Sequence, residues 1–202
     1  MHKLVLVAAC AVLLAGQIPE AAAAAKKTSP KSKKAAQNSG LLVAADFEKE
    51  GYVSGYFSNN PNDNSQSCSI EVVSPGYGDT GKCLKLVYDV DSPKEAYNGF
   101  WMKLNGESTL DISKYSKLVF RVKGDDKLGY TQKIKLELKN ASEVSAVYID
   151  GIRNDWKALE IPLEYFKEIT NWTQMTEFVI CFDIQTTKRT GAIYVDDITF
   201  VK

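Results

Sequence analysis

The sequence predicts an all-β fold, an antiparallel jelly-roll type of β-sandwich with about ten strands in one domain over residues 41–202. Short runs of β-branched and aromatic residues recur along this stretch, and turn-rich text such as SNNPNDNSQ and KGDDKLG separates them. Only residues 163–168 and 111–115 have the composition of short helical turns. About 160 residues is the usual length of one sandwich domain.

The first 40 residues are predicted to lie outside this domain. Residues 1–25 combine a short basic start, an apolar run too short to span a bilayer and a series of alanines, which is typical of an export signal. A lipoprotein-like box ends at Cys10, but only nine residues precede it, so lipidation is the lesser alternative. Residues 26–40 hold five lysines and no acid and are predicted to be a disordered basic linker. We therefore expect an exported protein, periplasmic or extracellular, without a stable membrane span.

The expected strands follow in order from the apolar runs between turns. They are residues 41–48, 67–73, 82–90, 97–104, 116–123, 133–139, 144–149, 156–161, 177–184 and 192–201. The run KIKLELK alternates cleanly, as a strand with one buried face should. Its three aliphatic residues, Ile134, Leu136 and Leu138, are expected in the core, and its charged residues are expected to face solvent.

The last strand carries two adjacent carboxylates, Asp196 and Asp197. Successive side chains of a strand point to opposite faces, so these two cannot act on one substrate atom. Regular alternation would place Asp196 on the same face as Tyr194, Ile198 and Phe200. If that face is the core, Asp196 points inward and requires a partner.

Several classes of chemistry are excluded by what the chain lacks. The single histidine, His2, lies in the expected export signal, which excludes Ser-His-Asp and Cys-His nucleophile systems and most zinc sites. There is no glycine-rich phosphate loop and no metal-binding cysteine spacing. Residues 41–202 hold 19 basic and 24 acidic side chains, which argues against a nucleic-acid groove. The protein is therefore expected not to be an enzyme.

Three cysteines remain after the export signal: Cys68, Cys83 and Cys181. Each lies in apolar, strand-like text, where cysteine often acts as a small hydrophobic residue. If two of them form a disulfide in an oxidising compartment, Cys68 and Cys83 are the favoured pair because they flank one expected hairpin.

Four stretches carry a resemblance to a known class of domain. They are ADFEKEG (45–51), LDISKYSKLVFRVKGD (110–125), DWKALEIPLEYF (155–166) and IYVDDITF (193–200). In their order and spacing the chain resembles the calcium-containing carbohydrate-binding modules of the galactose-binding-domain-like class, and also the Complex I intermediate-associated protein family. The resemblance implies a jelly roll whose first and last strands lie close together and often share a structural cation.

That implication suggests a role for the acids at the two ends of the domain. Asp46 and Glu48 lie on one face of the first expected strand, and Asp196 would approach them from the last. Three carboxylates with nearby carbonyl oxygens suit a hard cation, so a structural calcium ion is expected. The alternative is that these acids are solvated and that Asp196 accepts hydrogen bonds from backbone amides of a loop.

A sugar site requires flat aromatic faces beside polar side chains. The stretch YNGFWMKLNG is the richest in both, and Tyr97, Trp101 and Lys103 share one of its faces. Residues from other stretches are expected to extend this surface: Tyr56 and Phe57, and Tyr148 with Arg153. Trp156 and Phe166 are assigned to packing because the matching family stretch places them there, whereas Trp172, in a loop, fits either role.

The function expected from the sequence is that of an exported, non-catalytic carbohydrate-binding module that recognises a polysaccharide or cell-envelope glycan. The alternative is a periplasmic interaction or assembly protein that uses the same fold to bind a protein partner in the cell envelope. A glycan binder should expose a row of aromatic side chains with polar ones between them, and a docking protein should expose one contiguous apolar patch.

Overall fold

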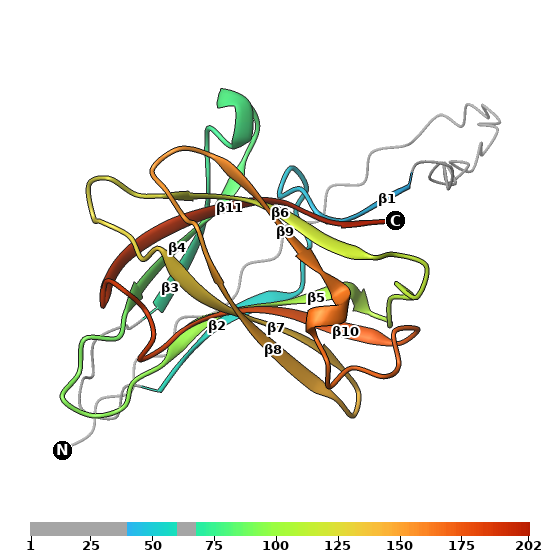
Figure 1. The fold of residues 1–202 in the computed structure, drawn as a ribbon. Coiled ribbons are helices and arrows are strands. Elements are labelled where there is room, and N and C mark those ends of the chain that lie inside the picture. Colours follow the sequence, from blue (N-terminus) through green and yellow to red (C-terminus); the bar gives the residue numbers. More distant parts are fainter. Residues whose placement is uncertain (1–39, 60–67) are drawn as a thin grey trace, which may run out of the picture. The chain divides into compact units, whose positions relative to one another are not determined.

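The computed structural model describes residues 40–59 and 68–202, which form two antiparallel β-sheets packed face to face (Figure 1). One sheet has the order β3-β4-β11-β6-β9, with β1 also paired to β11, and the other has the order β2-β5-β10-β7-β8. The expected export signal and all but the last residue of the expected linker lie outside the described residues.

The strands of the first sheet are β1 (Leu41–Ala45), β3 (Cys68–Val73), β4 (Cys83–Asp89), β6 (Lys117–Gly124), β9 (Lys157–Pro162) and β11 (Thr190–Val201). Those of the second sheet are β2 (Ser54–Ser58), β5 (Asn98–Glu107), β7 (Lys133–Asn140), β8 (Val144–Asp150) and β10 (Met175–Phe182). Two short 3-10 turns, η1 (Tyr77–Asp79) and η2 (Leu163–Tyr165), complete the described elements.

The core lies between the two sheets and is built from alternating side chains. Ile134, Leu136 and Leu138 of β7 are buried, as their alternation predicted. Large aromatic side chains, among them Phe100 and Phe178, fill the space between the sheets at 0% exposure. Because each strand contributes one face to this layer, its other face points outward, and the two outer faces are the surfaces on which ligands can bind.

The all-β sandwich is confirmed, and ten of its strands lie near the expected positions. The eleventh, β2, was not expected, because SGYFS is short and rich in glycine and serine, and its one partner among the described strands is β5. The expected helical turn over 111–115 is wrong, since no helix forms there, and the one over 163–168 is the single turn η2.

The expected alternation through the last strand is also wrong, and a β-bulge is the reason. The register of β11 with β6 shifts between Asp196 and Thr199, and Asp197 has a φ of 49°. An extra residue of this kind reverses which side chains face inward. Tyr194 and Asp196 therefore point to the outer side of the sheet, while Ile198 and Phe200 are fully buried.

The cysteines do not form the favoured disulfide, and all three are free and buried. Cys68 is the register partner of Tyr88, and Cys83 is the partner of Val73. The two thiols thus belong to opposite ends of one hairpin, about 16 Å apart at a rise of about 3.3 Å per residue, which is too far for a bridge. Burial raises the pKa of Cys68 to about 12, so this thiol stays protonated at neutral pH.

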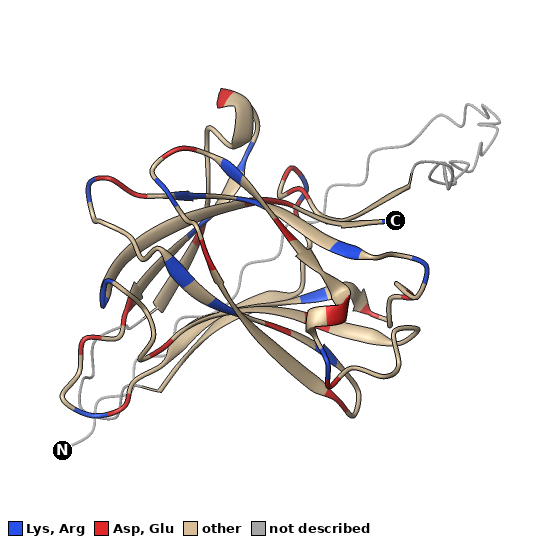
Figure 2. Ribbon diagram, in the orientation of Figure 1, with Lys and Arg blue, Asp and Glu red and all other residues tan. Residues whose placement is uncertain are grey.

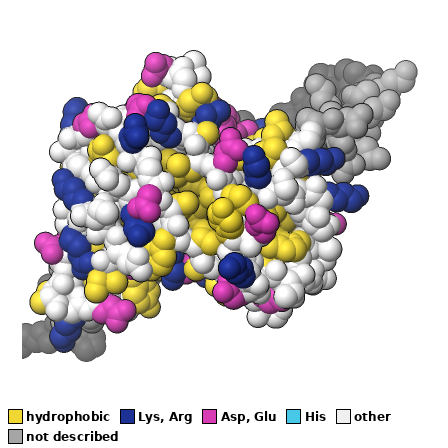
Figure 3. Space-filling view, in the orientation of Figure 1, with side chains coloured by type: hydrophobic (Ala, Val, Ile, Leu, Met, Phe, Trp, Pro, Cys, Tyr) yellow, Lys and Arg dark blue, Asp and Glu magenta, His cyan; other side chains and the backbone are white. Residues whose placement is uncertain are grey.

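The edge strands β8 and β9 leave part of the core layer open. Val147 and Ile149 of β8 and Leu159 of β9 face the core but stay partly exposed. Figure 3 shows hydrophobic side chains gathered at the middle of the side that carries these strands. Charged residues of both signs are interspersed over both sheets and their loops (Figure 2). Within the described part of the chain, no helix has the length and apolar character to cross a membrane.

Candidate functional site

The outer face of the β2-β5-β10-β7-β8 sheet carries the aromatic residues that the sequence singled out. Register partners on neighbouring antiparallel strands point to the same side of a sheet, so the pairing identifies neighbours on this face. Trp101 of β5 pairs with Gly55 of β2, and Phe57 of β2 pairs with Gly99 of β5. On this outer face, Trp101 and Phe57 are therefore each opposite a glycine.

The two glycines leave room for these rings on the outer face. A Cβ at Gly55 would lie 2.9 Å from Nε1 of Trp101, and one at Gly99 would lie 2.9 Å from Cζ of Phe57. Each ring therefore occupies space that a side chain at the opposite position would take. Aromatic rings on the outer face of a sheet can stack on the C–H face of a sugar ring.

A hollow extends from Phe57 across the sheet to β8. It has a volume of about 610 Å³, with Phe57 and Tyr97 at one end and Tyr148 at the other. The ring of Tyr97 lies 6.3 Å from that of Phe57. Cys181 of β10 lines the hollow between the two ends.

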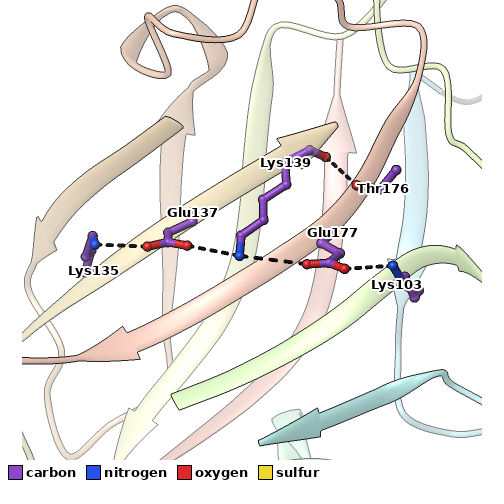
Figure 4. A network of polar contacts seen from close by, with 6 residues as sticks. All are labelled: Lys103, Lys135, Glu137, Lys139, Thr176 and Glu177. Atoms are coloured by element: carbon purple, nitrogen blue, oxygen red, sulfur yellow. Dashed lines mark hydrogen bonds and ion pairs between the residues drawn. The ribbon is translucent and has the colours of Figure 1, made fainter. Parts of the chain in front are cut away.

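A chain of ion pairs crosses the same face beside the aromatic residues (Figure 4). Lys103 Nζ lies 2.7 Å from Glu177 Oε1, and Lys139 lies 3.8 Å from the other oxygen of Glu177. Glu137 then joins Lys139 at 3.4 Å and Lys135 at 2.9 Å. These side chains are partly buried and hold one another in place, so they offer fixed donors and acceptors to hydroxyl groups.

Tyr148 is fixed at its end of the hollow by one strong hydrogen bond. Its hydroxyl donates to Asp183 Oδ2 at 2.6 Å, and the ammonium of Lys133 lies 5.6 Å from its ring centre. Burial of the hydroxyl, together with this bond, raises the pKa of Tyr148 to about 12. The ring is 41% exposed, which leaves one aromatic face open to a ligand.

The structure brings together four of the six side chains expected in a sugar site: Tyr97, Trp101, Lys103 and Tyr148. Tyr56 is not part of this surface, because it pairs with the buried Phe100 and so points to the opposite side of β2. Arg153 is also elsewhere, since its carbonyl oxygen accepts a hydrogen bond from the amide of Gly124 in the other sheet.

Phe57, expected together with Tyr56, belongs to this surface, and the pairing of β2 with β5 decides between the two. The charged residues of β7 were not expected in the site. The alternation of KIKLELK did place Lys135, Glu137 and Lys139 on one outer face. Only the sheet order, which puts β10 between β5 and β7, shows that this face continues to the aromatic side.

The expected metal ligands come together only in part. Glu48 Oε1 accepts a hydrogen bond from the amide of Lys82 at 2.9 Å, and Asp196 Oδ2 accepts one from the amide of Tyr77 at 2.9 Å. Asp46 is separate, because its carboxylate accepts the hydroxyl of Tyr52 at 2.7 Å. No group of three or more His, Cys, Asp or Glu side chains suited to a metal ion occurs among the described residues.

Asp196 is a buried carboxylate that accepts hydrogen bonds from the backbone amides of Tyr77 and Asp197, as the alternative to a metal site expected. Burial raises the pKa of Asp196, these two hydrogen bonds lower it, and the charges of Asp197 and Glu48 raise it. A Cβ at Gly76 would lie 2.6 Å from the carbonyl oxygen of Lys82 and 2.8 Å from Asp196 Oδ2. Carboxylate and carbonyl oxygens are the ligands that a hard cation prefers, and the calcium site stays a prediction.

Two aromatic residues, Phe166 and Trp156, were expected to serve packing, and Trp172 was expected in either role. Phe166 is buried at 1% exposure, so its assignment is confirmed. Trp172 packs against the core from a loop. The assignment of Trp156 is wrong, because its ring lies 6.5 Å from that of Tyr194 on the outer side of the other sheet.

Comparison with known proteins agrees with this geometry. Residues 44–202 match the family model described as carbohydrate binding domain 30. None of the curated protein sequences matches the chain.

Solved structures with a similar fold include two modules of Clostridium thermocellum cellulosomal cellulases. The family 11 carbohydrate-binding module of Lic26A-Cel5E has a TM-score of 0.60 at 19% identity, covering 81% of this chain and 95% of its own. The family 30 module of Cel9D-Cel44B has a TM-score of 0.61 at 16% identity, covering 80% of this chain and 98% of its own. A further structure of the family 11 module, in complex with a β-1,3-1,4-mixed-linked tetrasaccharide, has a TM-score of 0.58 at 20% identity and covers 76% of this chain and 92% of its own.

Proposed function

The chain belongs to the carbohydrate binding domain 30 family, and from this premise we propose that it binds a polysaccharide across the outer face of the β2-β5-β10-β7-β8 sheet. Family membership makes it a non-catalytic binding module. The observation that carries the proposed location is the pair of rings, Trp101 and Phe57, each placed on the outer face against the glycine opposite it. A polysaccharide chain would cross the strands from these rings to Tyr148, with its hydroxyl groups over the ion pairs.

The experiment is to measure binding of the purified protein to a panel of soluble polysaccharides and cell-envelope glycans. The panel starts with mixed-linked β-glucan, because a module with a similar fold was solved with a tetrasaccharide of that linkage. We expect binding to at least one glycan class, accompanied by a change in tryptophan fluorescence as a sugar covers Trp101. Absence of binding to every member would overturn the proposal and favour the alternative of a protein partner in the cell envelope.

We also propose that a calcium ion stabilises the fold, held by Glu48 and Asp196. A Cβ at Gly76 would lie 2.8 Å from Asp196 Oδ2 and 2.6 Å from the carbonyl oxygen of Lys82, and this pair of oxygen atoms beside one position supports the proposal, as does the raised pKa of Asp196. An acid whose pKa is higher in the folded state binds its proton more tightly there, so stability falls as the pH rises through the two pKa values. At neutral pH the ionised carboxylate therefore disfavours the native state, and a divalent cation beside it would reverse that effect.

The thermal midpoint in excess calcium and in chelator measures this contribution. An ion at a hundred times its dissociation constant adds about 2.7 kcal/mol, which raises the midpoint by several degrees. Glu48→Gln should lose most of the rise, because the carboxylate charge is gone while an oxygen remains for the Lys82 amide. Glu50→Gln, an exposed acid of the same loop, is the matched control and should keep it. Equal thermal midpoints in calcium and in chelator would contradict the proposal that calcium stabilises the fold.

Export is proposed on the sequence of residues 1–25 alone. The mature protein is expected to begin near Ala23 to Ala25 and to occur in the periplasm or outside the cell. N-terminal sequencing of the protein recovered from each cell fraction tests this, and an intact Met1 on the accumulated protein would contradict it.

A further inference from the structure

A second aromatic surface lies on the outer face of the other sheet. Tyr194 of β11 is the register partner of Lys85 on one side and of Lys123 on the other. Trp156, which directly precedes β9, continues this row, with its ring 6.5 Å from that of Tyr194. The Lys123 ammonium lies 5.5 Å from the Trp156 ring centre and 5.2 Å from that of Tyr194.

The projecting turn η1 closes one end of this row (Figure 1). Its first residue, Tyr77, stands edge-on to Trp156 at a ring distance of 6.1 Å and an angle of 84°. The guanidinium of Arg121 lies 4.3 Å from the Tyr77 ring centre. The hydrogen bond from the Tyr77 amide to Asp196 holds the turn in place, so the position of this ring is set by the buried carboxylate.

The cationic side chains of this surface differ in whether they form an ion pair with a carboxylate. Lys85 lies 3.1 Å from Asp125, which also accepts the hydroxyl of Tyr194 at 2.7 Å. Burial opposes ionisation of Asp125, but these bonds and two backbone amides outweigh it and lower its pKa. Lys123 and Arg121, by contrast, form no salt bridge within residues 40–59 and 68–202, although Arg121 is the register partner of Asp196, and both lie over aromatic rings.

Packing of the core does not account for this arrangement. Neither Trp156 nor Tyr194 belongs to the core cluster or to the partly buried residues packed against it, and Tyr77 is 40% exposed. Beside the rings lies a hollow of about 320 Å³, lined among others by Lys85, Lys123 and Tyr194. A row of partly exposed rings next to two cations that form no salt bridge in the described part of the chain matches a ligand that has both an apolar face and a negative charge.

We propose that this surface is a second carbohydrate site, one that takes polysaccharides whose sugars carry carboxylate groups. A sugar ring stacks against Trp156 and Tyr77, and its carboxylate receives hydrogen bonds from Lys123 and Arg121. Arginine suits this role because its planar donors match the two oxygens of a carboxylate. The site lies on the opposite outer face from the one proposed above and depends on none of its residues.

Single-stranded nucleic acid also combines flat rings with negative charge. The acidic excess of residues 41–202 disfavours a ligand with one phosphate for every nucleotide. Asp125 and Asp126 line the hollow beside Tyr194, and their carboxylates also disfavour a phosphate there. A uronic acid polymer also carries one negative charge on every residue, so charge alone does not separate the two ligands. Residues 44–202 match a carbohydrate-binding family, and we therefore place the uronic acid polymer first and make nucleic acid an outcome of the test.

The test compares polygalacturonate with its methyl-esterified form, which has the same backbone and no carboxylate charge. The purified protein should bind polygalacturonate more tightly than the ester, and added salt should weaken that binding. The double variant Arg121→Gln/Lys123→Gln should lose about tenfold or more in affinity for polygalacturonate. Its thermal midpoint should stay close to that of the unchanged protein, because both side chains are partly exposed and make no ion pair.

Two control variants test whether the binding comes from this site. One tests for unspecific attraction to positive charge, and the other tests for binding at the first site. Lys117→Gln removes a lysine of the same strand that pairs with Glu160 at 3.0 Å, and it should leave the affinity unchanged. Trp101→Ala should also leave it unchanged. The proposal is overturned if the protein does not bind polygalacturonate, or if the double variant binds it as tightly as the unchanged protein does. It is also overturned if the double variant loses affinity for a single-stranded oligonucleotide but not for polygalacturonate.

Discussion

Replacing Trp101 with alanine is expected to weaken binding of the preferred polysaccharide by about a hundredfold. Trp101 is the largest side chain on the proposed glycan face, and its ring lies against Gly55. Truncating a central aromatic contact of a binding surface costs about 2 to 4 kcal/mol, and about 1.4 kcal/mol corresponds to a factor of ten. Isothermal titration with the glycan found in the panel measures the loss. Stability should change little, because the side chain packs on the outside of the sheet.

Two further variants define what this result means. Tyr165→Ala removes a 56% exposed ring away from the face and should bind normally. Gly55→Ala keeps the tryptophan but puts a Cβ against the end of its ring, which can tilt away, so binding should fall severalfold while the fold survives. If Trp101→Ala binds as tightly as the unchanged protein, the polysaccharide does not use this face.

Replacing Gly99 with alanine is expected to destabilise the whole domain by about 3 kcal/mol or more. The new Cβ would lie 2.0 Å from the carbonyl oxygen of Ile180 and 3.0 Å from the Cα of Cys181. Both atoms belong to the backbone of β10, at the centre of the sheet, so neither can move without breaking strand pairing. Overpacking that the backbone has to absorb is among the most damaging substitutions.

Urea unfolding of Gly99→Ala beside Gly55→Ala measures this difference. The two glycines lie on paired strands and face the same side, but only the Cβ at position 99 meets backbone. We therefore expect a large fall in the free energy of unfolding for Gly99→Ala and a small one for Gly55→Ala. Similar values for the two would show that the β5 and β10 backbones are less closely packed than the structure indicates.

Local patterns of the chain were sufficient to predict the fold class and most strands. Alternation in KIKLELK placed Ile134, Leu136 and Leu138 in the core, because one face of such a strand is buried wherever it packs. The same rule failed at Asp196, since a single extra residue in β11 reverses the faces, and nothing in IYVDDITF marks that insertion. It also failed for β2, whose glycine and serines became a strand only through pairing with β5.

The sequence by itself determined that this protein is an all-β sandwich without histidine chemistry, and that Tyr97, Trp101 and Lys103 share one face of a strand. Which surface these residues belong to was decided only by the tertiary structure. Sheet order brought β10 and β7 beside β5, and the strand register put Gly55 opposite Trp101 and Gly99 opposite Phe57. The tertiary structure also placed Trp156 on the outer side of the opposite sheet. Neighbours across strands come from distant parts of the chain, and the pairing that joins them depends on how all the strands bury their apolar faces together.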